Sequence, residues 1–268
     1  MRKNGWIRWI LVAALFATTV GCAIDGAIFV PAQTGELRRE LQTVELGEAR
    51  EVRAVIRMGA GDLQIDSGTG SLLEAEFVYD VDEWKPEVTY EVDDGSGRLI
   101  VRQPSTDQIM TSSQARYSWD LTFNESTPLD LRIDCGAGKS EIDISDMGLT
   151  RLDMRLGVGD AVIDVADNPN LTRVDLQLGA GEVEINLNGE WQQDATIDIQ
   201  GGIGRSRLQL PKDVGVIVRV TKGIGDVDVS GLFRRGDTYV NAAYDEAEVV
   251  LDITVRTGIG SVNLDVIE

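Results

Sequence analysis

The chain has 268 residues, 43% of them hydrophobic, and its 45 acidic and 25 basic side chains give a net charge of −20. This acidity argues against nucleic-acid binding, which needs clustered Lys and Arg to neutralise phosphates. The complete absence of histidine excludes Ser-His-Asp and Cys-His catalysis and removes the commonest metal ligand, so an enzyme would depend on carboxylates, Lys, Arg or Tyr.

The first 22 residues, MRKNGWIRWILVAALFATTVGC, are typical of a secretory signal. Three basic residues precede an apolar stretch from Trp9 to Gly21, which is too short to span a bilayer comfortably. The ending Gly21-Cys22 resembles the bacterial lipobox, in which cleavage leaves a lipidated cysteine. We therefore expect a signal peptide over residues 1–21 and a linker over 22–36. The alternatives are an ordinary signal peptide or an uncleaved anchor.

The lipid would hold the exported protein on the cell membrane or the outer membrane, facing outside the cytoplasm.

A first domain is predicted over residues 37–128. It contains alternating runs at Leu73–Val78, Val88–Val92 and Leu99–Val101, separated by turn residues, which is a β-meander pattern. The polar run Ser105–Gln114 predicts a loop.

A Gly-x-Gly unit recurs along the chain, and between the second and sixth copies the spacings are 21, 22, 23 and 21 residues. A phosphate-binding loop does not recur at a constant period, so these units are predicted to be turns. The units begin at Gly59, Gly136, Gly157, Gly179, Gly202, Gly223 and Gly258.

Each unit lies between two runs that alternate with period 2, which predicts strand, glycine turn, strand. The residues three before and four after each turn are of core type, for example Met154 and Ile163. One repeat cannot bury its own apolar face, so the repeats must stack. The sequence therefore predicts an all-β fold, a β-solenoid or stacked β-arch repeat of about 22 residues, with a C-terminal solenoid over 129–268. Cys135 is expected to be a buried free thiol.

The outward columns of this repeat are charged. Opposite charges are expected to meet on adjacent repeats in three pairs: Asp134 with Arg155, Arg132 with Asp153, and Asp198 with Arg219.

Another column is acidic, and in it Asp143 and Asp164 would face each other at about 4.8 Å. A divalent cation could bridge these carboxylates, which makes them candidate metal ligands. A solvated surface is the other interpretation, and we expect no cofactor.

The segment GLFRRGDTYVNAAYDEAEV lengthens the interval between the last two Gly-x-Gly units and predicts a hairpin or cap. Tyr239 and Tyr244 are expected to pack over the open end of the stack. Arg234 and Arg235 are candidate contacts to a partner.

Several stretches resemble known families. MGAGDLQID, LEAEFVYDVDEWKPEVTYEV and GRLIVRQP resemble the N-terminal domain of bacterial toast-rack proteins. The segments GVIVRVTKGIGDVDVSGLFRRGDTYVNAAY and LDITVRTGIGSVNLDV are similar to the C-terminal domain of cell-wall-active antibiotic response, LiaF-like, proteins. Together they cover about residues 37–268. The resemblance implies a β-rich protein of the cell envelope and supplies no catalytic residues.

Three functions follow from these observations. The first is a non-catalytic, envelope-tethered structural or interaction lipoprotein that presents a repetitive acidic surface to an envelope protein or glycan. The second is envelope-stress sensing or regulation through a membrane partner, which the LiaF-like resemblance implies. The third is a polysaccharide-binding or polysaccharide-active β-helix protein, in which Trp84 and Trp119 could stack on sugar rings.

Overall fold

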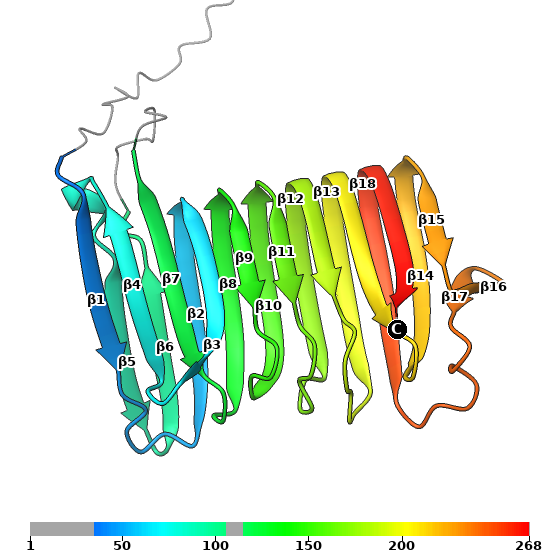
Figure 1. Ribbon diagram of the computed structural model, residues 1–268, viewed down its shortest axis with the longest axis horizontal. Coiled ribbons are helices and arrows are strands. Elements are labelled where there is room, and N and C mark those ends of the chain that lie inside the picture. Colours follow the sequence, from blue (N-terminus) through cyan, green and yellow to red (C-terminus); the bar gives the residue numbers. More distant parts are fainter. Residues whose placement is uncertain (1–34, 106–114, 268) are drawn as a thin grey trace, which may run out of the picture.

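The computed structural model describes residues 35–105 and 115–267. They form a long, flattened stack of β-strands standing side by side (Figure 1). The predicted signal peptide, Cys22 and most of the predicted loop at 105–114 lie outside the described residues. The all-β, repeat-based prediction is confirmed.

Each repeat contributes two legs, which we call the first leg, before the Gly-x-Gly turn, and the second leg, after it. In four repeats the legs are separate strands: β2 (Glu51–Ala60) with β3 (Asp62–Thr69), β8 (Leu129–Ala137) with β9 (Ser140–Asp143), β10 (Leu149–Val158) with β11 (Ala161–Asp164), and β14 (Gly215–Ile224) with β15 (Val227–Ser230). In the other three a single strand runs through the turn: β12 (Arg173–Asn186), β13 (Ala195–Pro211) and β18 (Val250–Ile267). Corresponding legs pair in parallel, so the repeats form two facing layers.

The N-terminal segment extends both layers instead of forming a separate meander. Strand β6 (Ser96–Arg102) pairs in parallel with β2, and β5 (Glu87–Asp93) closes that layer as a hairpin. In the other layer β7 (Tyr117–Asn124) pairs in parallel with β3, followed by antiparallel β4 (Leu73–Tyr79) and β1 (Arg38–Val44). A single 3₁₀ turn, Asp82–Trp84, follows β4. These antiparallel strands end the stack on this side.

The core lies between the two layers and is built from the predicted columns. Met154 and Ile163, before and after the same turn, are both fully buried. At the lower turns, opposite the Gly-x-Gly edge, the anchors Leu149, Leu171 and Trp191 are also buried. Asn168 is wholly buried there, where its amide donates to the carbonyl oxygens of Ile144, Val165 and Ala166 and its Oδ1 accepts from Leu149. The polar group therefore satisfies the backbone of the turn.

The stacking requires both glycines of a turn, except at Gly59 in the first turn, where a Cβ would meet only the side chain of Gln103. The second one has a positive φ, for example +143° at Gly159. A Cβ there would lie 1.8 Å from the carbonyl oxygen of Gly138, and a Cβ on Gly157 would lie 2.1 Å from that of Gly136. Neighbouring turns can approach to strand spacing only because neither position carries a side chain.

The order of the last repeats differs from the order in the sequence. Strand β18 lies between β13 and β14, pairing in parallel with both. The predicted pair of Asp198 with Arg219 is therefore wrong. Asp198 accepts from Arg256 at 3.1 Å, and Arg219 pairs with Asp252 at 2.6 Å. All repeats share one apolar pattern, so period alone does not fix which repeat lies beside which.

The C-terminal hairpin covers only part of the stack's far end. It consists of β16 (Phe233–Arg235) and β17 (Thr238–Val240), and β17 pairs antiparallel with β14 over Ile217–Arg219. Tyr239 is half-buried, in keeping with the expected packing. Val229, in a core column of the last second leg, remains 40% exposed because β15 pairs only with β18.

Candidate functional site

The outward face of the first legs is a lattice of ion pairs. Two predicted pairs are present, Arg155 with Asp134 at 3.5 Å and Arg132 with Asp153 at 3.8 Å. Further bridges join Arg53 to Asp130, Arg57 to Asp134, Arg151 and Arg173 to Asp175, Arg173 and Arg256 to Asp198, and Arg219 to Asp252. Each half-exposed bridge contributes only about 0–1 kcal/mol. Cations and anions alternate across the strands, so this face is locally neutralised.

The outward face of the second legs has a different charge balance. Its two paired cations are Lys139, bound to Glu141, and Arg205, bound to Glu182. Together with Arg207 they stand against eleven carboxylates: Asp62, Asp66, Glu141, Asp143, Asp160, Asp164, Glu182, Glu184, Asp226, Asp228 and Asp265. We call this surface the acidic face. The excess negative charge of the repeats is therefore concentrated on one side of the stack.

The two candidate metal ligands lie within the acidic face. Asp143 and Asp164 are register partners on β9 and β11, as the repeat predicts. Asp143 Oδ1 accepts from the backbone N–H and hydroxyl of Ser145, and Asp164 accepts from the N–H of Ala166 and the amide of Asn186. Among the described residues no three His, Cys, Asp or Glu side chains converge as a metal site would require.

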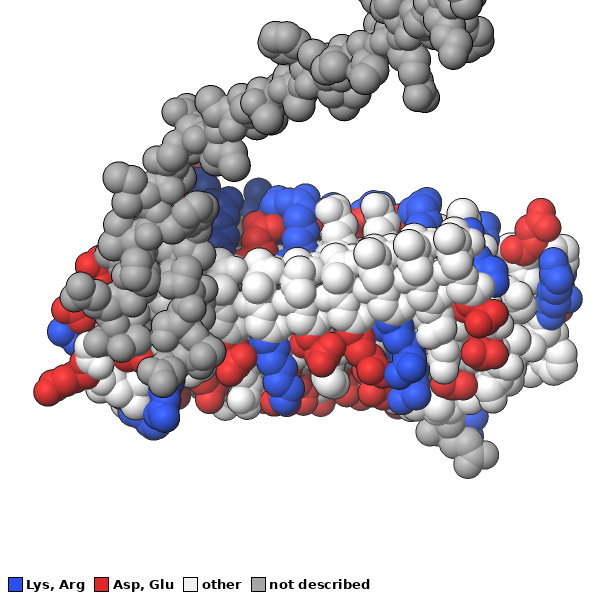
Figure 2. Space-filling model, turned by 90° about the horizontal axis from the view of Figure 1, so that it is seen from above, with Lys and Arg blue, Asp and Glu red and all other residues white. Residues whose placement is uncertain are grey.

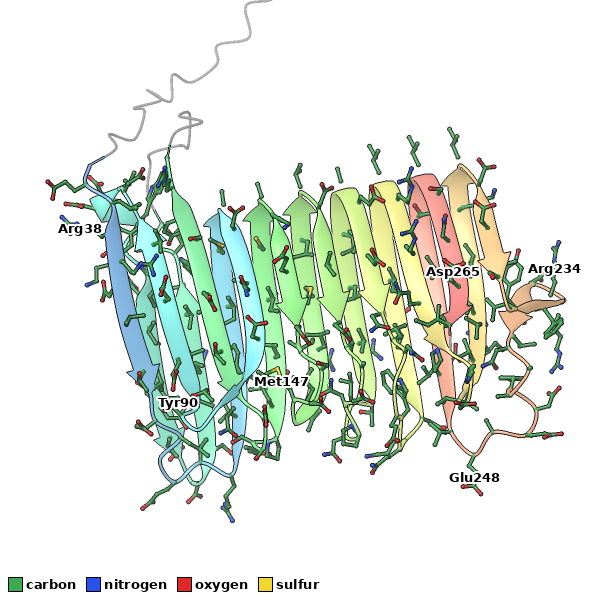
Figure 3. The ribbon with its side chains drawn as sticks, in the orientation of Figure 1. Arg38, Tyr90, Met147, Arg234, Glu248 and Asp265 are labelled. Carbon is green, nitrogen blue, oxygen red and sulfur yellow. The ribbon has the colours of Figure 1, made fainter. Side chains whose placement is uncertain are left out.

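The candidate partner contacts lie on the C-terminal hairpin. The guanidinium of Arg234 donates to the carbonyl oxygen of Gly236, and its side chain projects from the end of the stack (Figure 3). Arg235 forms a bidentate bridge to Asp245, at 2.8 and 2.6 Å, and its guanidinium lies 5.5 Å from the ring centroid of Tyr244. Arg235 is therefore held by residues that follow the hairpin, Asp245 and Tyr244, whereas Arg234 is the more available of the two.

The tryptophans do not form a sugar-binding surface. Trp84 and Trp119 are each 1% exposed and pack edge-on around Tyr117, with centroids 5.6 and 5.8 Å from it. A buried indole cannot stack on a glycan ring. Cys135 is a buried free thiol, and burial raises its pKa, which keeps it protonated and unreactive.

One exposed feature escaped the sequence reasoning. The middle residue of each Gly-x-Gly turn points outward at the upper edge, and in every turn it is aliphatic: Ala60, Ala137, Val158, Ala180, Ile203, Ile259 and Ile224 in spatial order. We call this row the apolar ridge. Figure 2 shows it as an uncharged band between charged rows. The sequence signal for the ridge was that the residue between the two glycines is aliphatic in every turn. The sequence reasoning considered only the glycines on either side of it.

The part of the chain that the structure describes contains no helix long and apolar enough to cross a membrane.

Two known protein families match this chain. Residues 33–170 match the family model of the toast-rack N-terminal domain, and residues 157–264 match the C-terminal domain of the cell wall-active antibiotics response protein LiaF. No curated protein matches the chain significantly.

Similar solved structures include the following two. A candidate cell adhesion protein from Clostridium sporogenes is 27% identical with a TM-score of 0.68, over 86% of this chain and 99% of that one. A candidate adhesin from Bacteroides fragilis is 11% identical with a TM-score of 0.43, over 85% and 97%. With a toast-rack N-terminal domain over half its length and a LiaF-like domain after it, the chain belongs to the toast-rack family.

Proposed function

We propose that this protein is a non-catalytic interaction lipoprotein, tethered at the cell envelope through Cys22, whose rigid stack presents the acidic face to an extended partner. The observation that carries the proposal is the unequal distribution of charge. One face has its arginines and aspartates interlocked, whereas the other leaves most of its carboxylates without a cation. An envelope protein or glycan with basic groups at regular intervals would be complementary to it.

The comparisons support the coarser part of this proposal. A LiaF-like domain and a structural likeness to a candidate adhesion protein both point to the cell envelope and to binding rather than catalysis. The lipobox-like Gly21-Cys22 supplies the means of attachment.

The test is photo-crosslinking in living cells with a probe amino acid at matched positions. Val162 is 51% exposed at the centre of the acidic face, and Gln177 is exposed on the ion-paired face of a neighbouring repeat. We expect a defined crosslinked species from Val162 and much less from Gln177. Equal crosslinking from both positions, or none from Val162, would overturn the assignment of the acidic face.

A regulatory function is the second candidate, because residues 157–264 match the LiaF domain. This function would need a membrane partner at the C-terminal end, where Arg234 projects (Figure 3). A probe at Arg234 that captures one integral membrane protein would support regulation. Capture only at Val162 would favour the interaction function.

A further inference from the structure

The apolar ridge is an exposed line of aliphatic side chains that packing within the chain does not explain. Ile203, Ile224 and Ile259 are 60%, 71% and 49% exposed, and Val158 is 63% exposed. The register places all seven ridge residues on adjacent strands, so at 4.7–4.9 Å per strand the ridge runs for about 29 Å. On soluble proteins, large contiguous patches of exposed apolar side chains bordered by polar residues mark sites of protein or membrane interaction.

The opposite edge of the same stack has a different character. Its turns expose Asp146, Glu190, Gln193 and Asp213. Both edges are built from the connections of the same repeat, and both expose side chains to solvent. None of the seven ridge positions carries a charged residue. The turn itself requires glycine only on either side of the ridge residue, so this absence reflects the surroundings of the ridge edge.

The chain enters the stack at the ridge edge. Gly35, the first described residue, donates its N–H to the carbonyl oxygen of Asp80 at 2.6 Å, directly after β4. Figure 1 shows this entry at the same upper edge as the Gly-x-Gly turns. Gly35 follows Cys22 by 13 residues, which reach at most about 45 Å when fully extended. A lipid on Cys22 would therefore join the stack at this edge and not at the polar one.

We infer that the apolar ridge lies against the surface of the bilayer that holds the Cys22 lipid, so that the stack stands on the membrane along this edge. The inference rests on the proposed tether. A ridge one residue wide is convex, and two such ridges could bury little of the roughly 1,600 Å² that a stable protein interface needs. A bilayer surface, in contrast, deforms around a narrow ridge and accepts its aliphatic side chains among the headgroups.

The charges beside the ridge set a direction of tilt. On the first-leg side the outward row closest to the ridge holds Arg57, Arg155 and Arg256 against one carboxylate, Asp134, so it keeps a positive excess although each guanidinium is ion-paired. Their long side chains can reach headgroup phosphates while the ridge contacts the acyl boundary. On the other side the closest row holds four carboxylates, Asp62, Asp160, Glu182 and Asp226, against two cations, Lys139 and Arg205. This net negative row would be repelled by anionic lipid. The stack would lean toward its ion-paired face and leave the acidic face free for a partner.

The test uses the acylated full-length protein reconstituted in phosphatidylcholine–phosphatidylglycerol vesicles. An environment-sensitive fluorophore is attached at Ile259→Cys on the ridge, or at Gln193→Cys on the polar edge as the matched control. Cys135 is buried and stays unlabelled. We expect the ridge probe to shift to shorter wavelength and to be quenched by brominated acyl chains, and the control probe to do neither.

A second variant tests the aliphatic side chains themselves. With the probe at Val158→Cys, Ile203→Ser, Ile224→Ser and Ile259→Ser together should abolish most of the quenching. Val162→Ser, which removes an exposed aliphatic side chain from the acidic face, should leave it unchanged. The substituted isoleucines are about half or more exposed, so the fold should be retained, which circular dichroism checks.

Vesicle flotation separates the two proposals. If the acylated chain floats with the vesicles but the ridge probe is unquenched, or is quenched no more than the control, the tether stands and the ridge inference is overturned. If the acylated chain does not float, the tether itself fails. A ridge probe that is shielded without vesicles, together with a dimer in sedimentation that the serine variant loses, would show a second copy to be the occupant and would also overturn the inference.

Discussion

At the residue scale, the fold depends on positions where a side chain is forbidden. The two glycine columns let successive turns stack at strand spacing, and the residue between them points outward beside its counterparts in adjacent turns. The same local geometry therefore explains both the invariant glycines and the apolar ridge. Gly159 is a good place to test it because it lies in the middle of the stack, where no end effect can relieve a clash.

Gly159→Ala should lower the free energy of unfolding by about 3 kcal/mol or more, because its φ of +143° disfavours a side chain and its Cβ would meet a backbone oxygen at 1.8 Å. Gly47→Ala is the matched control. Gly47 also has a positive φ, +62°, but its Cβ would meet nothing within 4 Å, so only about 1 kcal/mol should be lost. Urea unfolding measures both. Similar losses in the two variants would show that backbone strain alone, without stacking, requires the glycines.

At the element scale, the order of the strands and their register determine which charged side chains lie next to each other. Strand β18 inserts between β13 and β14, so residues of the last repeat contact the fifth and sixth repeats at once. At the other end β7 places Asp120 opposite Glu76 of β4, an arrangement of like charges that the antiparallel register imposes. Each arrangement has a measurable energetic consequence.

The insertion of β18 predicts which charges are coupled. A double-mutant cycle with Asp198→Ala and Arg256→Ala should give a coupling of about 0.2–1 kcal/mol, as expected for a partly exposed pair 3.1 Å apart. The cycle of Asp198→Ala with Arg219→Ala should give a coupling of about zero. Arg219 lies on β14, beyond β18, and binds Asp252 of β18 instead of Asp198. Urea unfolding supplies the four free energies of each cycle. A larger coupling to Arg219 would restore the order of the repeats in the sequence.

The Asp120 carboxyl predicts a pH dependence. Desolvation by the neighbouring strands, with repulsion from the nearby carboxylates Asp66 and Glu76, raises the pKa of the exposed Asp120 carboxyl above its ordinary value of 3.8. The folded chain thus binds this proton more tightly than the unfolded chain, and stability is lost as pH rises through the titration. Because solvent screens this exposed carboxyl, Asp120→Asn should stabilise the protein at pH 7 by only about a few tenths of a kcal/mol. The gain should vanish below about pH 3.8, where the carboxyl is protonated in both states.

The control for this titration is Glu91→Gln, because the Glu91 carboxylate lies opposite Arg98 and not opposite another acid. It should give no gain at pH 7. Urea unfolding of both variants at pH 7 and pH 3 provides the comparison. A gain for Asp120→Asn that is the same at both pH values would rule out the carboxylate charge as its cause.

At the scale of the whole molecule, the repeat was predictable and its order was not. The spacing of the glycine pairs and the aliphatic columns around Met154 and Ile163 were sufficient to predict parallel stacked repeats, because only such stacking buries those columns. The insertion of β18 involves the same type of contact as the predicted order, so period cannot distinguish them. The position of Asp143 beside Asp164 followed from the period, whereas the tight engagement of Arg235 with Asp245 depends on a hairpin geometry that the sequence does not specify.

The measurement that tests the central claim most directly is the intact mass of the protein extracted from cell membranes, compared with a Cys22→Ser variant. An envelope-tethered lipoprotein predicts a mature chain that begins at Cys22 and carries the added mass of its acyl groups. It also predicts that this form is absent from the Cys22→Ser variant. An unacylated mature chain, or one that retains residues 1–21, would contradict the tether and with it the orientation of the stack on the membrane.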